Sequence, residues 1–272
     1  MIRTRDALVL LALGLVARAL LTLYLPASVD DAWREPAAQL AGQVVLVAAC
    51  AIHLGRRAFS AAVFGPWPDR ASAAVAVALA LVLLMFTLGE NAVEALALAQ
   101  VDKAATWRLW GFHDQPLVYA AFLSPPVLAY VGVSVLVGPF VEEYFFRGLL
   151  LPSLGARLGP AAGALVVSLL FTALHFSRMY FVSTMVFSLS LCGLYLVLRS
   201  VAACWIAHAA FNLAAFVHQD DFDIHWTRPQ ATLDTAAAWR PELAMLALSV
   251  AALAAAGVHW RHRIAAAIAP LA

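Results

Sequence analysis

The stretch Gly138–Leu151, GPFVEEYFFRGLLL, places three charged residues inside an otherwise apolar run. A charge at bilayer depth costs roughly 2.5–3.5 kcal/mol on insertion scales, so such residues are normally paired or functional. Glu143 and Arg147 stand four residues apart in the favourable acid-first order and can neutralise one another on a helix. Glu142 lies about 100° around that helix and is left without this partner. The stretch by itself allows a structural ion-pair cluster or a functional site.

The surrounding composition is that of a membrane protein. Of the 272 residues, 64% are hydrophobic and 12% are charged, and apolar segments recur along the whole chain. Segments of about 17 or more apolar residues predict membrane-spanning helices. We therefore expect an all-α, polytopic transmembrane helical bundle of about eight spans. The expected spans are 7–25, 37–54, 71–99, 125–154, 160–176, 179–198, 201–217 and 243–260.

Local signals refine the expectations for the third and fourth spans. Ser124 followed by Pro125 is typical of a helix start, and Gly138-Pro139 predicts a kink in a segment too long for the bilayer. Trp107 and Trp110 predict an interfacial loop after the third span. Two carboxylates fall toward the far end of that span, where a solvated helix end explains them; these are Glu90 and Glu94.

Charge and cysteine spacing limit the ligands that the sequence predicts, and loop charge predicts the topology. The formal charge of +1 gives no case for binding to nucleic acid. The three cysteines fall in apolar segments without CxxC spacing and are expected to be buried apolar residues; they are Cys50, Cys192 and Cys204. Eight spans put both termini on one side, and the loops on that side carry more Arg and Lys. This bias favours a multi-pass protein of the cell membrane with cytoplasmic termini.

Three further polar residues recur in the spans after Glu142. Counted from the loops at 1.5 Å per residue, Glu142 lies about 20 Å along its helix and His175 about 24 Å along the next. Asn212 lies about 20 Å from the same side, and His208 is one turn lower on the same helix face. Singly, an intramembrane His or Asn is usually a packing residue. Four matching depths instead predict one polar layer built from three helices.

This layer suits hydrolysis of an acyl bond. A carboxylate beside an imidazole can take a proton from water, and His208 and Asn212 could donate hydrogen bonds to a developing oxyanion. A second reading makes Glu142, His175 and His208 the ligands of a catalytic zinc ion, although no HExxH is present. A third reading, from another class, is a proton-coupled transporter that uses Glu142, Glu90 and Glu94 as a relay, although no inverted repeat stands out.

The three motifs resemble those of the CPBP intramembrane proteases, the relatives of the type II CaaX prenyl endopeptidase and of bacteriocin-processing and immunity proteins. Glu142–Gly148 resembles the EExxxR motif, Phe171–His175 resembles FxxxH, and His208–Asn212 resembles HxxxN. The resemblance implies that Glu142 and His175 activate water while His208 and Asn212 hold the oxyanion. It also implies supporting roles for three residues, namely Glu143, Arg147 and Phe171.

The resemblance implies an organisation and a substrate class as well. Residues 1–124 would hold the first three transmembrane segments, 125–217 the catalytic core of segments four to seven, and 218–272 a polar loop and the last segment. The expected activity is a glutamate-type endopeptidase without a cofactor, acting on a membrane-anchored protein or peptide in the lipid bilayer near its C-terminus. Prenylated C-termini, bacteriocin leaders and C-terminal sorting tails all remain compatible.

Overall fold

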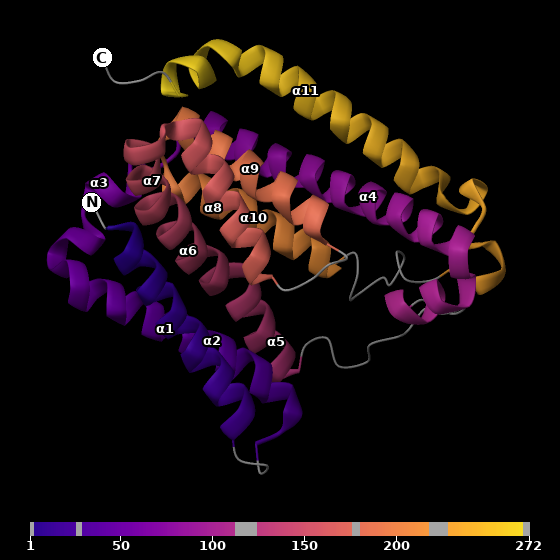
Figure 1. Ribbon diagram of the computed structural model, residues 1–272, viewed down its shortest axis with the longest axis horizontal. Coiled ribbons are helices and arrows are strands. Elements are labelled where there is room, and N and C mark those ends of the chain that lie inside the picture. Colours follow the sequence, from indigo (N-terminus) through magenta and orange to yellow (C-terminus); the bar gives the residue numbers. More distant parts are fainter. Residues whose placement is uncertain (1–2, 26–28, 112–123, 176–179, 218–227, 269–272) are drawn as a thin grey trace.

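The computed structural model describes residues 3–25, 29–111, 124–175, 180–217 and 228–268. Every regular element in these ranges is a helix, which confirms the all-α class (Figure 1). The helices are α1 (Thr4–Tyr24), α2 (Asp31–Leu54), η1 (Gly55–Phe59), α3 (Ala61–Phe64), α4 (Arg70–Trp110), α5 (Pro125–Val131), η2 (Gly132–Val137), α6 (Gly138–Glu143), η3 (Tyr144–Leu150), α7 (Leu151–Leu158), α8 (Pro160–Leu174), α9 (Phe181–Leu198), α10 (Val201–Phe216), η5 (Gln230–Thr232), η6 (Ala236–Trp239) and α11 (Arg240–Ile268).

Six helical stretches of the described chain are long and apolar enough to cross a membrane. Two shorter apolar helices, α8 and α10, bring the number of apolar segments to the eight that the sequence predicts. With 15 residues, α8 is about 22 Å long, less than the roughly 30 Å of a hydrocarbon core. By length alone, α8 is too short to span such a core.

The third span differs most from its prediction. Instead of ending near residue 99, α4 runs for 41 residues to Trp110. Asp102 has non-helical backbone angles, and its carboxylate accepts a hydrogen bond from the backbone N–H of Ala105 at 2.8 Å. Asp102 therefore bends the helix and caps the piece that follows. The loop predicted around Trp107 and Trp110 is wrong, because this cap restarts the helix where the apolar pattern ends.

The fourth span is one continuous but irregular helix made of α5, η2, α6, η3 and α7. It begins at Pro125 after Ser124, as predicted, although the Ser124 side chain makes no capping hydrogen bond. At Gly138-Pro139, where a kink is expected, α6 begins, and two π-helical stretches, η2 and η3, flank this short helix. A Cβ at Gly138 would lie 2.8 Å from the Gln43 amide nitrogen, so a larger residue would displace that side chain where α2 approaches.

The remaining helices enclose this irregular span. In Figure 1, α1 and α2 form an antiparallel pair on one side of it, while α4 and α11 run together on the other. Close approach of α1 and α2 depends on Gly14 and Gly42, since a Cβ on either would lie within about 3.0 Å of the other's carbonyl oxygen. The second span begins at Asp31 rather than near residue 37. All three cysteines are free and buried, as predicted.

Candidate active site

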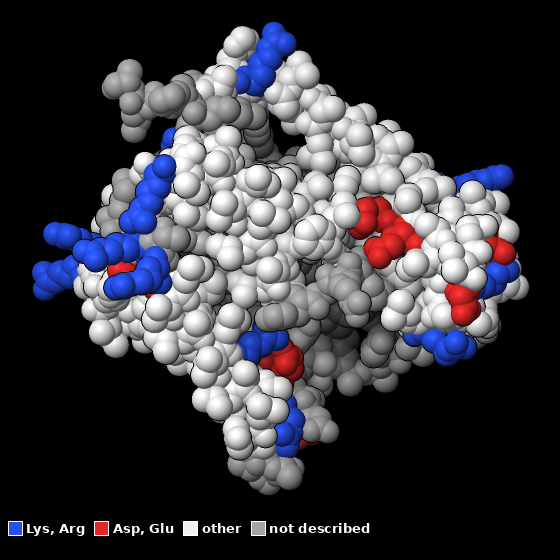
Figure 2. Space-filling model, viewed as in Figure 1, with Lys and Arg blue, Asp and Glu red and all other residues white. Residues whose placement is uncertain are grey.

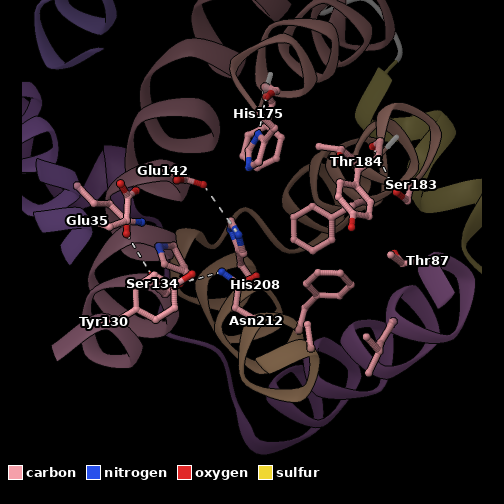
Figure 3. Close-up of a pocket in the computed structure, with 18 of the residues that line it drawn as sticks. Glu35, Thr87, Tyr130, Ser134, Glu142, His175, Ser183, Thr184, His208 and Asn212 are labelled. Atoms are coloured by element: carbon pink, nitrogen blue, oxygen red, sulfur yellow. Dashed lines mark hydrogen bonds and ion pairs between the residues drawn. The ribbon is translucent and has the colours of Figure 1, made fainter. Parts of the chain in front are cut away.

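A polar cavity of about 410 Å³ lies between the central helices. Glu142, His175, His208 and Asn212 all line it, so the structure brings together the four residues that the sequence placed at one depth (Figure 3). They come from α6, the end of α8 and α10. Their catalytic roles stay predictions, but their common location is a property of the fold.

Glu143 and Arg147 form the predicted ion pair, with 2.9 Å between Glu143 Oε1 and Arg147 Nη1. Both side chains are fully buried. Arg147 also donates to the backbone carbonyl and the hydroxyl of Ser188, at 3.1 and 2.8 Å, and its guanidinium lies 5.0 Å from the centre of the Phe171 ring. A buried charge is tolerated only with such partners. The pair thus joins η3 to α9 beneath the cavity.

Glu143 has a second partner that the sequence did not reveal. His208 Nδ1 lies 2.8 Å from Glu143 Oε1, the same oxygen that accepts from Arg147. A carboxylate only accepts, so the proton of this hydrogen bond sits on Nδ1. His208 Nε2 then points to the cavity, 3.9 Å from Glu142 Oε2. Glu143 therefore orients the imidazole, and the two adjacent glutamates contact opposite edges of one histidine.

His175 is held in the same manner by a backbone carbonyl. Its Nδ1 lies 2.8 Å from the carbonyl oxygen of Phe171, one turn earlier, so Nδ1 carries the proton. Nε2 of the neutral ring is left as a hydrogen-bond acceptor. The Phe171 ring packs 4.5 Å from the imidazole, centre to centre, and is itself buried. His175 is the first residue after α8, and its side chain borders the cavity.

The widened helix η2 positions Asn212. π-Helical stretches are rare and are frequently found at functional sites. The Asn212 amide donates to the carbonyl of Ser134 at 2.8 Å, and the Trp205 indole donates to that of Leu136 at 3.0 Å. Both acceptors lie in η2. One of the two N–H groups of Asn212 is thus used to fix the side chain, while the other has no partner among the described residues.

Several cavity residues were not identified from the sequence as functional candidates. Arg18 of α1 pairs with Glu35 of α2 at 2.5 Å, and both side chains are about half exposed, at 48% and 47%. Both line the cavity, as does Gln39, whose side-chain oxygen accepts from the Ser134 hydroxyl at 3.1 Å. An arginine within an apolar span is itself a functional signal. That signal could have found Arg18, whereas nothing local points to Ser134 or Gln39.

A second cavity of about 910 Å³ shares part of this lining. Glu142, Phe171 and His175 border both spaces, together with Arg18 and Gln39. The second cavity otherwise runs between α1, α2 and the central span along mostly apolar side chains. The walls of this space are Leu11, Gly14, Leu15, Val16, Ala19, Leu23, Leu46, Val141, Phe146 and Leu174, with Thr22, Gly42 and Gln43. Glu142 and His175 therefore stand where a polar cavity meets an apolar one.

Glu90 and Glu94 stand apart from both cavities. They were expected near the end of their span, but α4 continues to Trp110 and leaves them in its middle. Both are partly exposed, and neither lines either cavity. Figure 2 shows acidic atoms gathered over this part of α4. The linings of the two cavities therefore give no support to a proton relay from Glu142 through Glu90 and Glu94.

A catalytic zinc site would require Glu142, His175 and His208 to lie close together. Within the described ranges, no three His, Cys, Asp or Glu side chains lie close enough together to hold a metal ion. Glu142, His175 and His208 line one cavity without forming such a group, so zinc binding would require them to rearrange. Metal dependence itself is a question for experiment.

The fold and the site define a polytopic helical membrane protein with a polar cavity that is lined by two glutamates and two histidines. Residues 123–214 match the family described as type II CAAX prenyl endopeptidase Rce1-like. This match supports membership of the CPBP family of intramembrane proteases. The match indicates a multi-pass protease that acts on membrane-anchored protein. Neither a curated protein nor a solved structure matches the chain.

Proposed function

We propose that this protein is a glutamate-type endopeptidase in which Glu142 and His175 activate water to cleave a peptide bond of a membrane-associated substrate. The observation that supports this most is the shared lining: four polar side chains from three otherwise apolar helices border one cavity. Polar residues of this kind are costly in a membrane unless they are functional. The cavity also borders an apolar space that suits the lipid-facing part of a substrate.

Glu142 has the environment of a general base. Its side chain is 31% exposed, and its only ion pair among the described residues is the 3.9 Å approach of His208. Because Nδ1 of His175 donates to the Phe171 carbonyl, Nε2 is the nitrogen that can accept a hydrogen bond when the ring is neutral. A water molecule between them would lose a proton to Glu142 as its oxygen bonds to the substrate carbonyl carbon. The proton then passes to the leaving amine as the C–N bond breaks.

His208 and Asn212 would stabilise the oxyanion. Asn212 is fixed by its bond to Ser134 and keeps one free N–H. His208 already donates from Nδ1 to Glu143, so it can donate from Nε2 only when the ring is doubly protonated. In that form the negative charge of Glu143 lies directly behind the ring. Donors placed in this way act on charge that develops in the transition state.

The proposal is tested by comparing protein termini in membranes that contain the wild-type chain, Glu142→Gln, or no chain. We expect new C-terminal or N-terminal ends that require the wild-type protein and are absent with Glu142→Gln. Glu94→Gln is the matched control, because it removes a carboxylate of the same membrane region that lies outside both cavities. Identical termini with wild type and Glu142→Gln would contradict the proposal. Loss of the termini with Glu94→Gln, but not with Glu142→Gln, would also contradict it, because Glu94 lies outside both cavities.

A further inference from the structure

The polar cavity lies toward one side of the helix bundle. Its lining comes from the ends of α1, α8 and α10 and from the beginnings of α2, α5 and α9, and these helix ends all lie on the same side. The lining residues near these ends are Arg18, Glu35, Tyr130, His175, Ser183 and Ala215. We call this side of the molecule the mouth side. On the opposite side α1 begins, α2 ends and α8 begins.

The cavity is closed toward that opposite side. One to two turns beyond Glu142, the central span is completely buried at Phe145, Arg147 and Leu150. Helix α9 covers them with Leu191, which is also fully buried. A peptide approaching from this direction would have to cross the packed core. Water and substrate therefore reach Glu142 from the mouth side or laterally from the bilayer.

Positive charge is unevenly divided between the two sides. On the side opposite the mouth, nine described residues outside the apolar helix interiors are basic: Arg3, Arg5, Arg56, Arg57, Arg70, Arg157, Arg199, Arg261 and Arg263. The described part of the mouth side has five: Arg34, Lys103, Arg108, Arg228 and Arg240. Figure 2 shows basic side chains gathered at the end of the molecule where Figure 1 labels the N-terminus and α3. We call this end the basic side.

Short loops rich in Arg and Lys remain in the cytoplasm during membrane insertion. We propose that the basic side faces the cytoplasm and that the cavity opens on the extracytoplasmic face of the membrane. The orientation rests on helix direction and loop charge, while the cleavage rests on the proposed function. The distribution of Arg and Lys decides which side of the molecule faces the cytoplasm. The fold decides on which side of the molecule the cavity opens.

This orientation names the substrate class. The bond to be cut must lie in a membrane-anchored protein segment that has already crossed the membrane, close to its outer surface. A C-terminal tail that anchors an exported protein satisfies this requirement. A lipid-modified tail on the cytoplasmic surface does not, because it would meet the closed basic side. Among the substrates compatible with the family, the geometry favours the exported kind.

Two matched cysteine variants test the orientation without knowledge of the substrate. Ala237→Cys lies on the mouth side in η6, and Ala156→Cys lies on the basic side in α7; both positions are exposed. The wild-type chain is the background control, since its three cysteines are buried. Each protein is treated with a membrane-impermeant maleimide in right-side-out and in inverted membrane vesicles. We expect Ala237→Cys to react in right-side-out vesicles and Ala156→Cys to react in inverted ones.

The reverse labelling pattern would overturn the orientation, and with it the exported substrate class. Labelling of both positions in both kinds of vesicle would also overturn it, because the chain would then have no single orientation. The terminus comparison described above is run on the same strains. Reversed labelling with intact cleavage refutes only the orientation, whereas the expected labelling without any change in termini refutes only the proposed function.

Discussion

Exchanging each of the two adjacent glutamates for glutamine should have opposite effects on stability and activity. Glu143→Gln removes the negative charge beside Arg147, which is fully buried. Leaving a buried charge without its partner costs about 3–5 kcal/mol. We expect the lower end, about 3 kcal/mol, because the glutamine oxygen can still accept hydrogen bonds and Arg147 keeps its two bonds to Ser188. At about 2–4 °C per kcal/mol, the unfolding temperature should fall by roughly 6–12 °C.

Glu142→Gln should leave the unfolding temperature nearly unchanged. Its side chain is 31% exposed and its nearest charged group is 3.9 Å away, so we expect an effect within about 0.5 kcal/mol. Activity should be almost abolished, since an amide cannot accept the proton of the attacking water. The Glu143→Gln protein should keep measurable activity, lowered because His208 loses a charged partner.

Thermal unfolding and cleavage are measured on the same purified proteins in detergent or lipid. The double variant Glu143→Gln/Arg147→Met is the control, because an apolar side chain in place of Arg147 removes the unpaired charge. We expect it to recover most of the lost unfolding temperature. A wild-type unfolding temperature for Glu143→Gln, or a larger loss of stability in Glu142→Gln, would refute this division between the two residues.

Three further predictions address single groups. Asn212→Ala should lower kcat by about 10²–10³ with little change in KM, the effect typical of losing one oxyanion donor; a raised KM at normal kcat would make Asn212 a substrate-positioning residue. Activity should survive strong chelators, and protein prepared without added zinc should contain well under one zinc per chain. One zinc per chain, lost together with activity in His208→Ala, would refute the glutamate mechanism. Hydrogen bonds from Ser72 hold the pKa of Asp69 below its ordinary value of 3.8, so the stability contributed by this helix cap is complete above that pH and is lost as the pH falls through the lowered pKa. Asp69→Asn should remove this acid-dependent component from unfolding temperatures measured between pH 5 and 3, and an unchanged pH profile would contradict it.

The sequence alone determined the features that depend on local geometry. Residues four apart meet on a helix whatever its surroundings, so the Glu143–Arg147 pair could be predicted from spacing. Apolar length likewise predicted eight segments, because a membrane-spanning helix must satisfy its backbone internally. Depth counted along helices brought Glu142, His175, His208 and Asn212 to one level, and the fold places all four on one cavity.

Tertiary structure decided the features that depend on contacts between distant segments. His208 and Glu143 are 65 residues apart, and only the packing of α10 against the central span places the imidazole on that carboxylate. The same packing brings the carbonyl of Ser134 to the amide of Asn212, 78 residues away. Arg18 reaches the cavity only because α1 crosses α2 closely. Residue spacing along the chain does not predict these contacts. They depend on how the side chains of different helices pack together, whereas spacing only predicts which residues share a face of one helix.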